Sequence, residues 1–372
     1  MSPGALPPFP TPPPAGGERP RVSVVVVNHD YERFVGEAVD SALAQRGVDV
    51  EVIVVDDGST DGSREVLHAY GTRIRLVLQP NRGQAAAVDA GVAEARGGVV
   101  LLLDADDRLE PGVAARAADA IGSDPTVVRV VFRLAIVDEA GRPTGELTPP
   151  ADVPLAAGDV RRAILAHGDD VAWPPTSGNA FAAWALRRVL PLPPTSDRID
   201  ADAWLHPTVP LLGRVVALDG VGGAYRAHGA NAAFRAGVDV ARSRRVIATS
   251  ARVHGRVAQL ASELDLGPVE LRSVTLAAHR LVSLRLGGAG HPLARDTRWR
   301  AAADGLAAAA HRTDVAPARR LAYAGWLLAA CVAPRAWVGP LAEAFFVPAR
   351  RPRLLRRALR RAAARPGLEP GR

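Results

Sequence analysis

Four short apolar runs in the first third of the chain constrain its fold more than any other feature. None of them alternates apolar with polar residues, which is typical of strands buried on both faces of a sheet. Polar loops and helical patterns follow them, including Glu32–Gln45 and Gln84–Ala95. Strands alternating with helices need right-handed crossovers and predict a mostly parallel α/β sheet flanked by helices. The runs are Val22–Val27, Val50–Val55, Ile74–Leu78 and Val99–Leu103, and Val215–Leu218 is a later strand.

The fourth run ends abruptly in three carboxylates, Asp104, Asp106 and Asp107. Clustered carboxylates repel one another unless a cation or another partner offsets their charge. Asp104 and Asp106 are two residues apart, which on an extended backbone places their side chains on the same side. Oxygen ligands without nearby Cys or paired His favour a hard cation, Mg²⁺ or Mn²⁺. The residues alone leave open a solvated acidic turn before the next helix, whose start signals are Pro111 and Gly112.

The second run is followed by the loop DDGSTDGS, residues 56–63. Its Gly and Ser residues allow tight turns, and its hydroxyl and carboxylate side chains are suitable caps for the following helix. Two adjacent aspartates at a strand end also suit a hydrogen bond from a nucleobase imide. The loop matches neither the dinucleotide-binding nor the P-loop motif. In α/β sheets ligands bind outside the carboxyl ends of the strands, which is where this loop falls.

Composition sets further limits on the class of protein. The 372 residues are ample for one large domain with appendages. A single Cys excludes a disulfide framework or a thiolate metal site and suits a reducing compartment. Residues 1–20 are rich in Pro and lack the basic and apolar regions of a signal peptide, so we predict a disordered lead-in. The net charge of +7 is uneven, because residues 350–372 hold nine Arg and one Glu.

The C-terminal third reads as helical, with predicted helices at Val240–Leu264, Pro268–Leu286, Arg298–His311 and Ala318–Val332. The apolar stretch Leu321–Val332 is too short to span a bilayer of about 30 Å. Two readings of this region remain. Aromatic residues followed by the Arg cluster suit a segment lying at an anionic membrane surface. A helical appendage packed on the preceding domain is the alternative, and nucleic acid is not an expected partner.

Five segments in order carry a resemblance to a known family. The sequence resembles the family 2 glycosyltransferases of the GT-A fold over roughly Arg21–Phe234, and the ordered set is far more specific than any single piece. The resemblance implies a nucleotide-diphosphate sugar donor, a divalent metal and inversion at the anomeric carbon. The segments are VSVVVVNHDYERFVGEAVDSALAQ, VEVIVVDDGSTDGS, NRGQAAAVDAGVAEARGGVVLLLDADD, SGNAFAAWALRRVLPLP and YRAHGANAA.

The resemblance assigns roles to residues at the strand ends. It implies that Asp57 contacts the nucleobase, and it places Asn28 and Asp30 on the first nucleotide-contacting loop. It also implies that the D-x-D residues Asp104, Asp106 and Asp107 form the metal and diphosphate site. These assignments define one expected pocket, at the ends of neighbouring strands.

Arg226 and His228 are two residues apart and are expected to face the diphosphate together. Arg226 would supply a fixed charge, and His228 would act as a metal ligand or hydrogen-bond donor. A lone His is more often structural, so the assignment of His228 depends on the resemblance.

The predicted general base departs from the family pattern. The family usually shows Glu-Asp before a helix that carries Trp, whereas this chain has Ile199 and Asp200. Asp200 aligns with the base, and one carboxylate within reach of the acceptor hydroxyl suffices for that role. Asp202 is a competing candidate. Both residues read equally as solvated first-turn residues stabilised by the helix dipole.

The segment Pro174–Phe181 would line the acceptor side. Its Ser177, Gly178 and Asn179 either donate to sugar hydroxyls or only turn the chain. Trp173 is a candidate for stacking on a sugar, whereas Trp204, inside a helix, is expected in the core.

The predicted organisation is a lead-in at 1–20, a GT-A domain at 21–236, a helical region at 237–349 and an Arg-rich tail at 350–372. We expect a metal-dependent, inverting, hexosyltransferase-type enzyme that moves a sugar, from a UDP-sugar by preference, to a hydroxyl of a glycan, lipid-linked or small-molecule acceptor in polysaccharide or glycoconjugate synthesis. The expected location is the cytoplasm, with peripheral attachment to the inner face of the membrane left open. Alternatives are a sugar nucleotidyltransferase and a non-catalytic glycan- or partner-binding module.

Overall fold

The computed structural model describes residues 6–12, 22–192, 201–228, 239–312 and 315–346. It divides into two compact units, which we treat separately. The sheet unit comprises Met1–Arg162, Val171–Arg235 and Arg256–Pro268. The helical unit comprises Ala163–Asp170, Ala236–Gly255 and Val269–Arg372.

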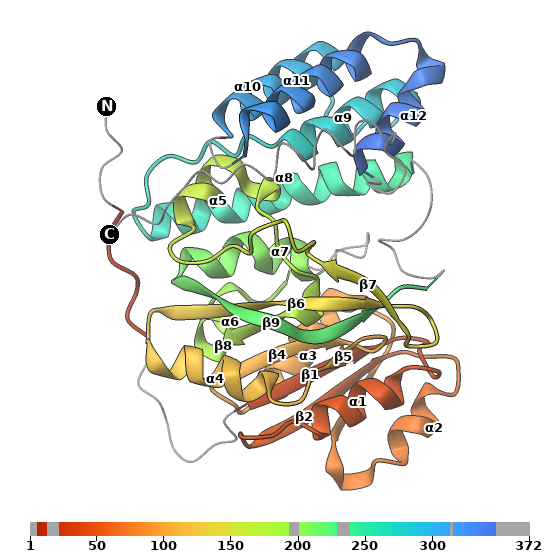
Figure 1. Ribbon diagram of the computed structural model, residues 1–372, viewed down its shortest axis with the longest axis vertical. Coiled ribbons are helices and arrows are strands. Elements are labelled where there is room, and N and C mark those ends of the chain that lie inside the picture. The colour runs from red at the N-terminus through yellow and green to blue at the C-terminus, as the bar shows by residue number, and fades with distance from the viewer. Residues whose placement is uncertain (1–5, 13–21, 193–200, 229–238, 313–314, 347–372) are drawn as a thin grey trace. The chain divides into compact units, whose positions relative to one another are not determined.

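The sheet unit is built around one sheet in which the described strands run in the order β3-β2-β1-β4-β8-β6-β9-β5, with β7 paired to β6 (Figure 1). The strands are β1 (Val22–Asn28), β2 (Val50–Asp57), β3 (Arg75–Gln79), β4 (Val99–Asp104), β5 (Arg108–Leu109), β6 (Val127–Val137), β7 (Pro143–Thr148), β8 (Asn179–Ala182) and β9 (Arg214–Arg226). The predicted α/β fold is confirmed, and all five predicted strands are present.

The sheet is mixed rather than parallel throughout. Strand β1 pairs in parallel with β2 and β4, and β2 pairs in parallel with β3, as the alternating pattern predicts. The short strand β8 then runs antiparallel between β4 and β6. A four-residue strand has too few positions to show a periodic signal, so this reversal could not be predicted from the sequence pattern.

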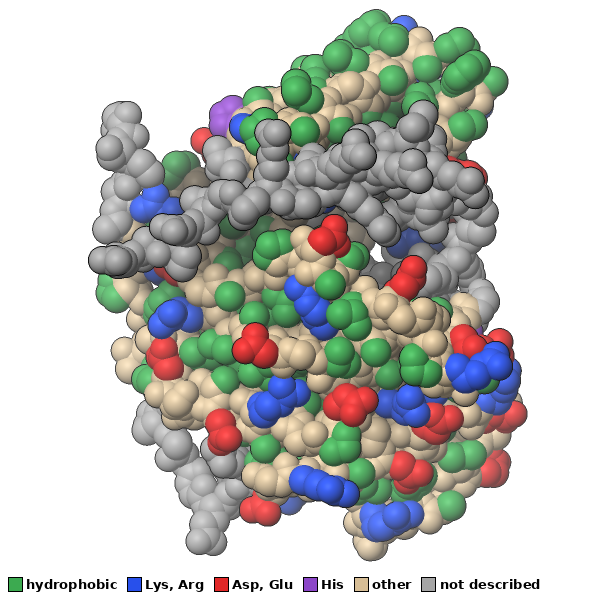
Figure 2. Space-filling view, in the orientation of Figure 1, with side chains coloured by type: hydrophobic (Ala, Val, Ile, Leu, Met, Phe, Trp, Pro, Cys, Tyr) green, Lys and Arg blue, Asp and Glu red, His purple; other side chains and the backbone are tan. Residues whose placement is uncertain are grey.

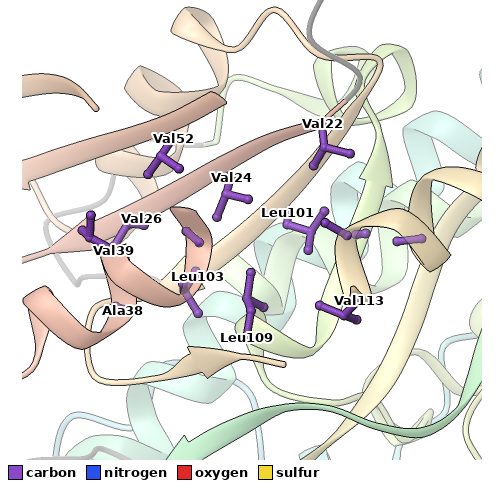
Figure 3. Close-up of a cluster of buried hydrophobic side chains, with 14 of the residues drawn as sticks. Val22, Val24, Val26, Ala38, Val39, Val52, Leu101, Leu103, Leu109 and Val113 are labelled. Carbon is purple, nitrogen blue, oxygen red and sulfur yellow. The ribbon is translucent and has the colours of Figure 1, made fainter. Parts of the chain in front are cut away.

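Helices cover both faces of the sheet. In the sheet unit they are α1 (Val35–Leu43), α2 (Ser63–His68), α3 (Gln84–Glu94), α4 (Val113–Ser123), α6 (Ala183–Val189) and α7 (Ala201–Thr208), with short 3-10 turns η1 (Gly71–Arg73), η3 (Thr176–Gly178) and η4 (Val209–Leu211). Figure 3 shows Ala38 and Val39 of α1 and Val113 of α4 packed with Val24 and Leu101. On the opposite face, α3 packs against β1 and β2 so closely that a Cβ on Gly91 would meet Val25 Cγ1 at 2.3 Å.

The helix predicted at Glu32–Gln45 begins later, at Val35. Asp30 adopts a left-handed backbone conformation, with φ of 57°, and the amides of Phe34 and Val35 donate to the Tyr31 carbonyl in a turn. This turn delays the helix and gives the loop after β1 its fixed shape.

The helical unit contains α9 (Val274–Leu286), α10 (Arg298–His311), α11 (Pro317–Val332) and α12 (Arg335–Phe346). Helix α8 (Val240–Glu263) belongs to it up to Gly255, and α5 (Arg161–His167) and η2 (Gly168–Asp170) complete the described elements. The predicted helix at Pro268–Leu286 begins only at Val274, because Ser273 and Asp170 cap it there. Small residues allow α9, α10 and α11 to share one core. In the described part of the chain, none of the helices has the length and apolar character needed to cross a bilayer.

Candidate functional site

The polar ends of three neighbouring strands meet at one edge of the sheet. Asn28 of β1 pairs with Asp56 of β2, and Val27 pairs with Asp104 of β4 on the other side. The loops carrying the predicted nucleotide and metal residues therefore start side by side, as expected for the carboxyl ends of parallel strands.

Asn28 and Asp56 hold the loops after β1 and β2 together. Both side chains are buried, and Asn28 Nδ2 donates to Asp56 Oδ1 at 2.9 Å and to Ser59 Oγ at 3.0 Å. Burial opposes ionisation of Asp56, but hydrogen bonds from Ser59, Arg64 and Asn28 outweigh it and lower the pKa of this carboxyl. The Oδ1 atom of Asn28 is buried and accepts no hydrogen bond from the described residues.

Asp30 extends this connection. Its amide donates to Ser59 Oγ at 3.0 Å, and its Oδ1 accepts from the Thr60 amide at 2.6 Å. The backbone hydrogen bond from Thr60 lowers the pKa of Asp30. The predicted nucleotide contacts of Asn28 and Asp30 remain predictions, and both residues also shape the loop that would make them.

Asp57 organises the start of α3. Its Oδ1 accepts from Gln79 Nε2 at 2.7 Å and from the Arg82 amide at 2.8 Å, and its Oδ2 accepts from the Gly83 amide at 2.7 Å. Both carboxylate oxygens therefore have protein donors. The predicted contact of Asp57 with a nucleobase remains a prediction.

The D-x-D segment forms a turn, which corrects the expectation of an extended backbone. Strand β4 ends at Asp104, and the Asp107 amide donates to the Asp104 carbonyl at 3.0 Å. Asp104 Oδ1 accepts from Gln84 Nε2 at 2.8 Å. Asp106 points its Oδ2 at His228 Nε2, at 2.9 Å. Asp104 and Asp106 thus have partners on different elements.

Asp107 is turned into the protein. Its Oδ2 accepts from Ser177 Oγ at 2.6 Å and its Oδ1 from the Arg226 amide at 2.9 Å, and the residue is 1% exposed. Burial, followed by the charges of Asp106 and Asp104, raises the pKa of Asp107 well above its usual range. The three carboxylates are therefore close enough to interact, but Asp107 directs both oxygens to protein donors.

Arg226 lies beneath this turn and is 1% exposed. Its Nε donates to the Asp106 carbonyl at 3.0 Å, and its Nη2 donates to Glu37 Oε2 at 2.7 Å. The guanidinium also lies 4.8 Å from the centre of the Phe34 ring. Its predicted contact with a diphosphate remains a prediction, and in this structure Arg226 fixes the backbone of the D-x-D turn.

His228 is the predicted metal ligand that the structure brings to the carboxylates. Its ring lies 5.3 Å from Phe34 and 5.7 Å from Tyr31, centre to centre. Burial, and then the nearby aspartates, raise the pKa of Tyr31. Within the described residues, no group of three or more His, Cys, Asp and Glu side chains is already arranged around a metal position. Asp106 and His228 form a pair.

The predicted base region is described from α7 onward. Asp200 and Ile199 lie outside the described residues, whereas Asp202 lies in the first turn of α7. The Ala201 amide donates to Gln84 Oε1 at 3.1 Å, so one side chain joins this helix to Asp104. Sequence reasoning missed Gln84, and the only local signal was a polar residue opening an alanine-rich helix.

The segment Pro174–Phe181, which we predicted to line the acceptor side, contacts a buried arginine, Arg129 on β6. Its Nε donates to Asn179 Oδ1 at 3.0 Å, and its Cζ lies 4.0 Å from the centre of the Trp173 ring. Burial lowers the pKa of Arg129 to about 9, against the opposing charge of Asp202. Burial, and then Arg129, lower the pKa of His206 well below its usual value.

Ser177 and Asn179 thus have structural partners, in Asp107 and Arg129, and Gly178 lies in a buried turn. The Trp173 ring lies against Arg129, and its predicted stacking on a sugar remains a prediction. Trp204 is in the core as predicted, where its Nε1 donates to the Val189 carbonyl at 3.2 Å.

The mixed sheet with its flanking helices has the fold of the GT-A class. The TarS protein of S. aureus, crystallised as residues 1–349 with UDP-GlcNAc, shares this fold with a TM-score of 0.56 and 17% identity over 87% of this chain and 91% of that chain. A family model described as glycosyl transferase family 2 matches residues 23–188. Residues 23–188 therefore form a family 2 glycosyltransferase domain, as the sequence motifs indicated.

Two curated relatives support the family. A glycosyltransferase of Nostoc sp., named alr2836, is 35% identical over 215 residues, which is 57% of this chain and 66% of that protein. The succinoglycan biosynthesis protein ExoO of Rhizobium meliloti is 41% identical over 120 residues, 31% of this chain and 34% of that protein. The chain therefore matches less than two thirds of the length of these relatives.

Proposed function

We propose that the protein transfers a sugar, with inversion, from a UDP-sugar to a hydroxyl of a growing glycan. The observation that carries this proposal is the adjacency of the β1, β2 and β4 ends, which groups Asn28, Asp56 and Asp104 at one edge of the sheet. That arrangement suits a ligand with a base at one end and a diphosphate at the other.

The donor set fits a hard divalent cation, Mg²⁺ or Mn²⁺. Asp106 and His228 already face each other, and Asp104 lies at the end of the adjoining strand, so these three side chains would hold the ion. We do not include Asp107 among the proposed metal ligands, because Ser177 and Arg226 already donate to its two oxygens. When bound, the ion supplies positive charge where the nucleoside diphosphate departs.

The other proposed roles in the transfer are carried out by side chains of the protein. Asp200 is the proposed general base that accepts the proton of the acceptor hydroxyl, with Asp202 as its competitor. Gln84 would set the position of the α7 start relative to Asp104, because it contacts both. Arg226 would hold the turn that presents Asp106.

The choice of donor and acceptor follows the named relatives. The TarS structure contains UDP-GlcNAc, and ExoO is named for succinoglycan biosynthesis. We therefore propose a UDP-sugar donor and a role in polysaccharide biosynthesis. The predicted cytoplasmic location and peripheral membrane attachment remain proposals, and the attachment concerns the helical unit rather than the transfer site.

The test is a donor screen followed by turnover. Thermal shifts with UDP-, GDP- and dTDP-sugars, with and without Mn²⁺, should show stabilisation by a UDP-sugar that increases with the metal, because a ligand selective for the folded state raises apparent stability. Release of UDP, with an inverted anomeric configuration in the product by NMR, then establishes transfer. Pyrophosphate release, or no stabilisation by any nucleotide sugar, would contradict the proposal.

A matched pair of variants locates the chemistry. Asp106→Asn should lower turnover by about 100-fold or more, since it weakens binding of the cation that would offset the negative charge of the departing diphosphate. Asp219→Asn, an exposed change on β9, should leave turnover unchanged. Equal activity of the two variants would remove Asp106 from the site.

A further inference from the structure

Helix α11 is apolar on its outward face as well as on its inward face. Its inward side chains, which include Leu327, Ala330 and Cys331, pack in the core of the helical unit. A surface helix normally carries polar residues on its other face. In α11, however, Leu321–Val332 contains no charged residue at all.

The outward side chains form a continuous stripe. Leu321, Leu328 and Val332 are 74%, 51% and 61% exposed, and their spacing of seven and four residues places them on one side of the helix. Trp337, on the adjoining helix α12, is 66% exposed. Figure 2 shows hydrophobic side chains gathered over this part of the helical unit. We name Leu321, Leu328, Val332 and Trp337 the outer stripe.

The sequence around the outer stripe is strongly basic. Residues 317–372 contain twelve Arg, no Lys and two acidic residues, a net charge of +10. Nine of these arginines follow α12, in residues 350–372. Exposed aliphatic and Trp side chains in a segment with an excess of basic residues are the combination that binds an anionic lipid surface, where apolar insertion and charge attraction add.

We propose that the outer stripe docks on the surface of an anionic phospholipid bilayer. The surface lies flat on the lipid rather than crossing it, because twelve uncharged residues are too few to span a hydrocarbon core of about 30 Å. A second copy of the chain is a poorer occupant. A symmetric contact through the outer stripe would bring two segments of +10 together.

The experiment measures binding of the full-length protein to vesicles by co-sedimentation. Vesicles of phosphatidylglycerol mixed with phosphatidylcholine should bind the protein, pure phosphatidylcholine vesicles should bind it much more weakly, and added salt should weaken the binding. The triple variant Leu321→Ser, Leu328→Ser, Trp337→Ser should lose at least about tenfold in affinity. Its far-UV circular dichroism and melting temperature should be unchanged, because these side chains point outward.

The control variant is Leu78→Ser with Leu293→Ser, which removes two exposed leucines that do not belong to the outer stripe and should bind like the unmodified protein. The proposal is overturned by absence of binding to the anionic vesicles, by equal binding to neutral vesicles, or by full binding of the triple variant. It is also overturned if the protein is a dimer without lipid and the triple variant is a monomer. Since the readout is lipid binding, its failure leaves the proposed sugar transfer untouched.

Discussion

Gln84 donates a hydrogen bond of 2.8 Å from its Nε2 to Oδ1 of Asp104. The Oε1 atom of Gln84 accepts a hydrogen bond of 3.1 Å from the Ala201 amide. One side chain therefore joins the acidic end of β4 to the start of α7. The two halves of the proposed reaction, departure of the diphosphate and activation of the acceptor, depend on these two elements.

Gln84→Ala should therefore lower kcat by about tenfold with a smaller change in the KM for the donor, because misplaced catalytic groups cost rate more than binding. Steady-state kinetics with the donor found in the screen measures this. Glu94→Gln, at the exposed end of the same helix, is the control and should leave both constants unchanged. An unchanged kcat in Gln84→Ala would show that this connection has no catalytic role.

His228→Ala should raise the Mn²⁺ concentration that gives half-maximal activity by about tenfold or more, because it removes one of three proposed ligands. A metal titration of turnover checks the shift. His311→Ala, an exposed change on α10, serves as the control. If both variants keep the original metal dependence, His228 packs against Phe34 and Tyr31 without binding the ion.

The strands of the parallel half of the sheet could be predicted because each is an apolar run of five or more residues with at most one polar residue in it. Strand β6 is equally buried but contains Arg129 and Arg133, which break the run. Burial of Arg129 is tolerated only because Asn179 and the Trp173 ring meet it, and those residues lie far along the chain. The sequence around Arg129 does not show that distant residues will stabilise its buried charge.

The same limit applies to the site. Residue types and spacing placed Asp104 and Asp106 near a common ligand, the family resemblance added His228, and the structure pairs Asp106 with His228. The turn at Asp104–Asp107 depends on Arg226 and Ser177, each at least 70 residues away. Gln84 and its partner Ala201 are 117 residues apart. Side-chain direction after a strand end is decided by such distant contacts, which short motifs do not encode.

Gly91→Ala should destabilise the sheet unit by about 1–3 kcal/mol, because an added methyl group overpacks a full core. The new Cβ would meet Val25 Cγ1 at 2.3 Å and Val55 Cγ2 at 3.2 Å, where α3 packs on the sheet. Urea unfolding measures the change. Gly98→Ala is the matched control, since no atom lies within 4 Å of its added Cβ, and similar losses in both variants would contradict the packing argument.

Asp296→Ala should destabilise the helical unit by about 3–5 kcal/mol, because it removes the buried carboxylate that pairs with a buried guanidinium. Asp296 accepts from Arg280 Nε at 2.7 Å and from Nη2 at 2.6 Å, and Arg280 is 8% exposed. Thermal unfolding monitored by circular dichroism checks this. Asp304→Ala removes the more exposed partner of Arg280 and should cost much less. Equal losses would show that burial of Asp296 is not the source of its contribution.

Asp89→Asn should stabilise the protein near neutral pH but not in acid. Burial of this α3 side chain raises the pKa of the carboxyl from 3.8 to about 6, although the Leu192 amide donates to it. The folded state therefore holds a proton that the unfolded state releases between these values, so stability falls as pH rises through about 6. Asn keeps an acceptor oxygen and loses the charge, which should gain about 1–2 kcal/mol at pH above 6 and almost nothing below pH 4. Urea unfolding of both proteins across this range measures the difference, and a gain that does not change with pH would contradict the assignment to Asp89.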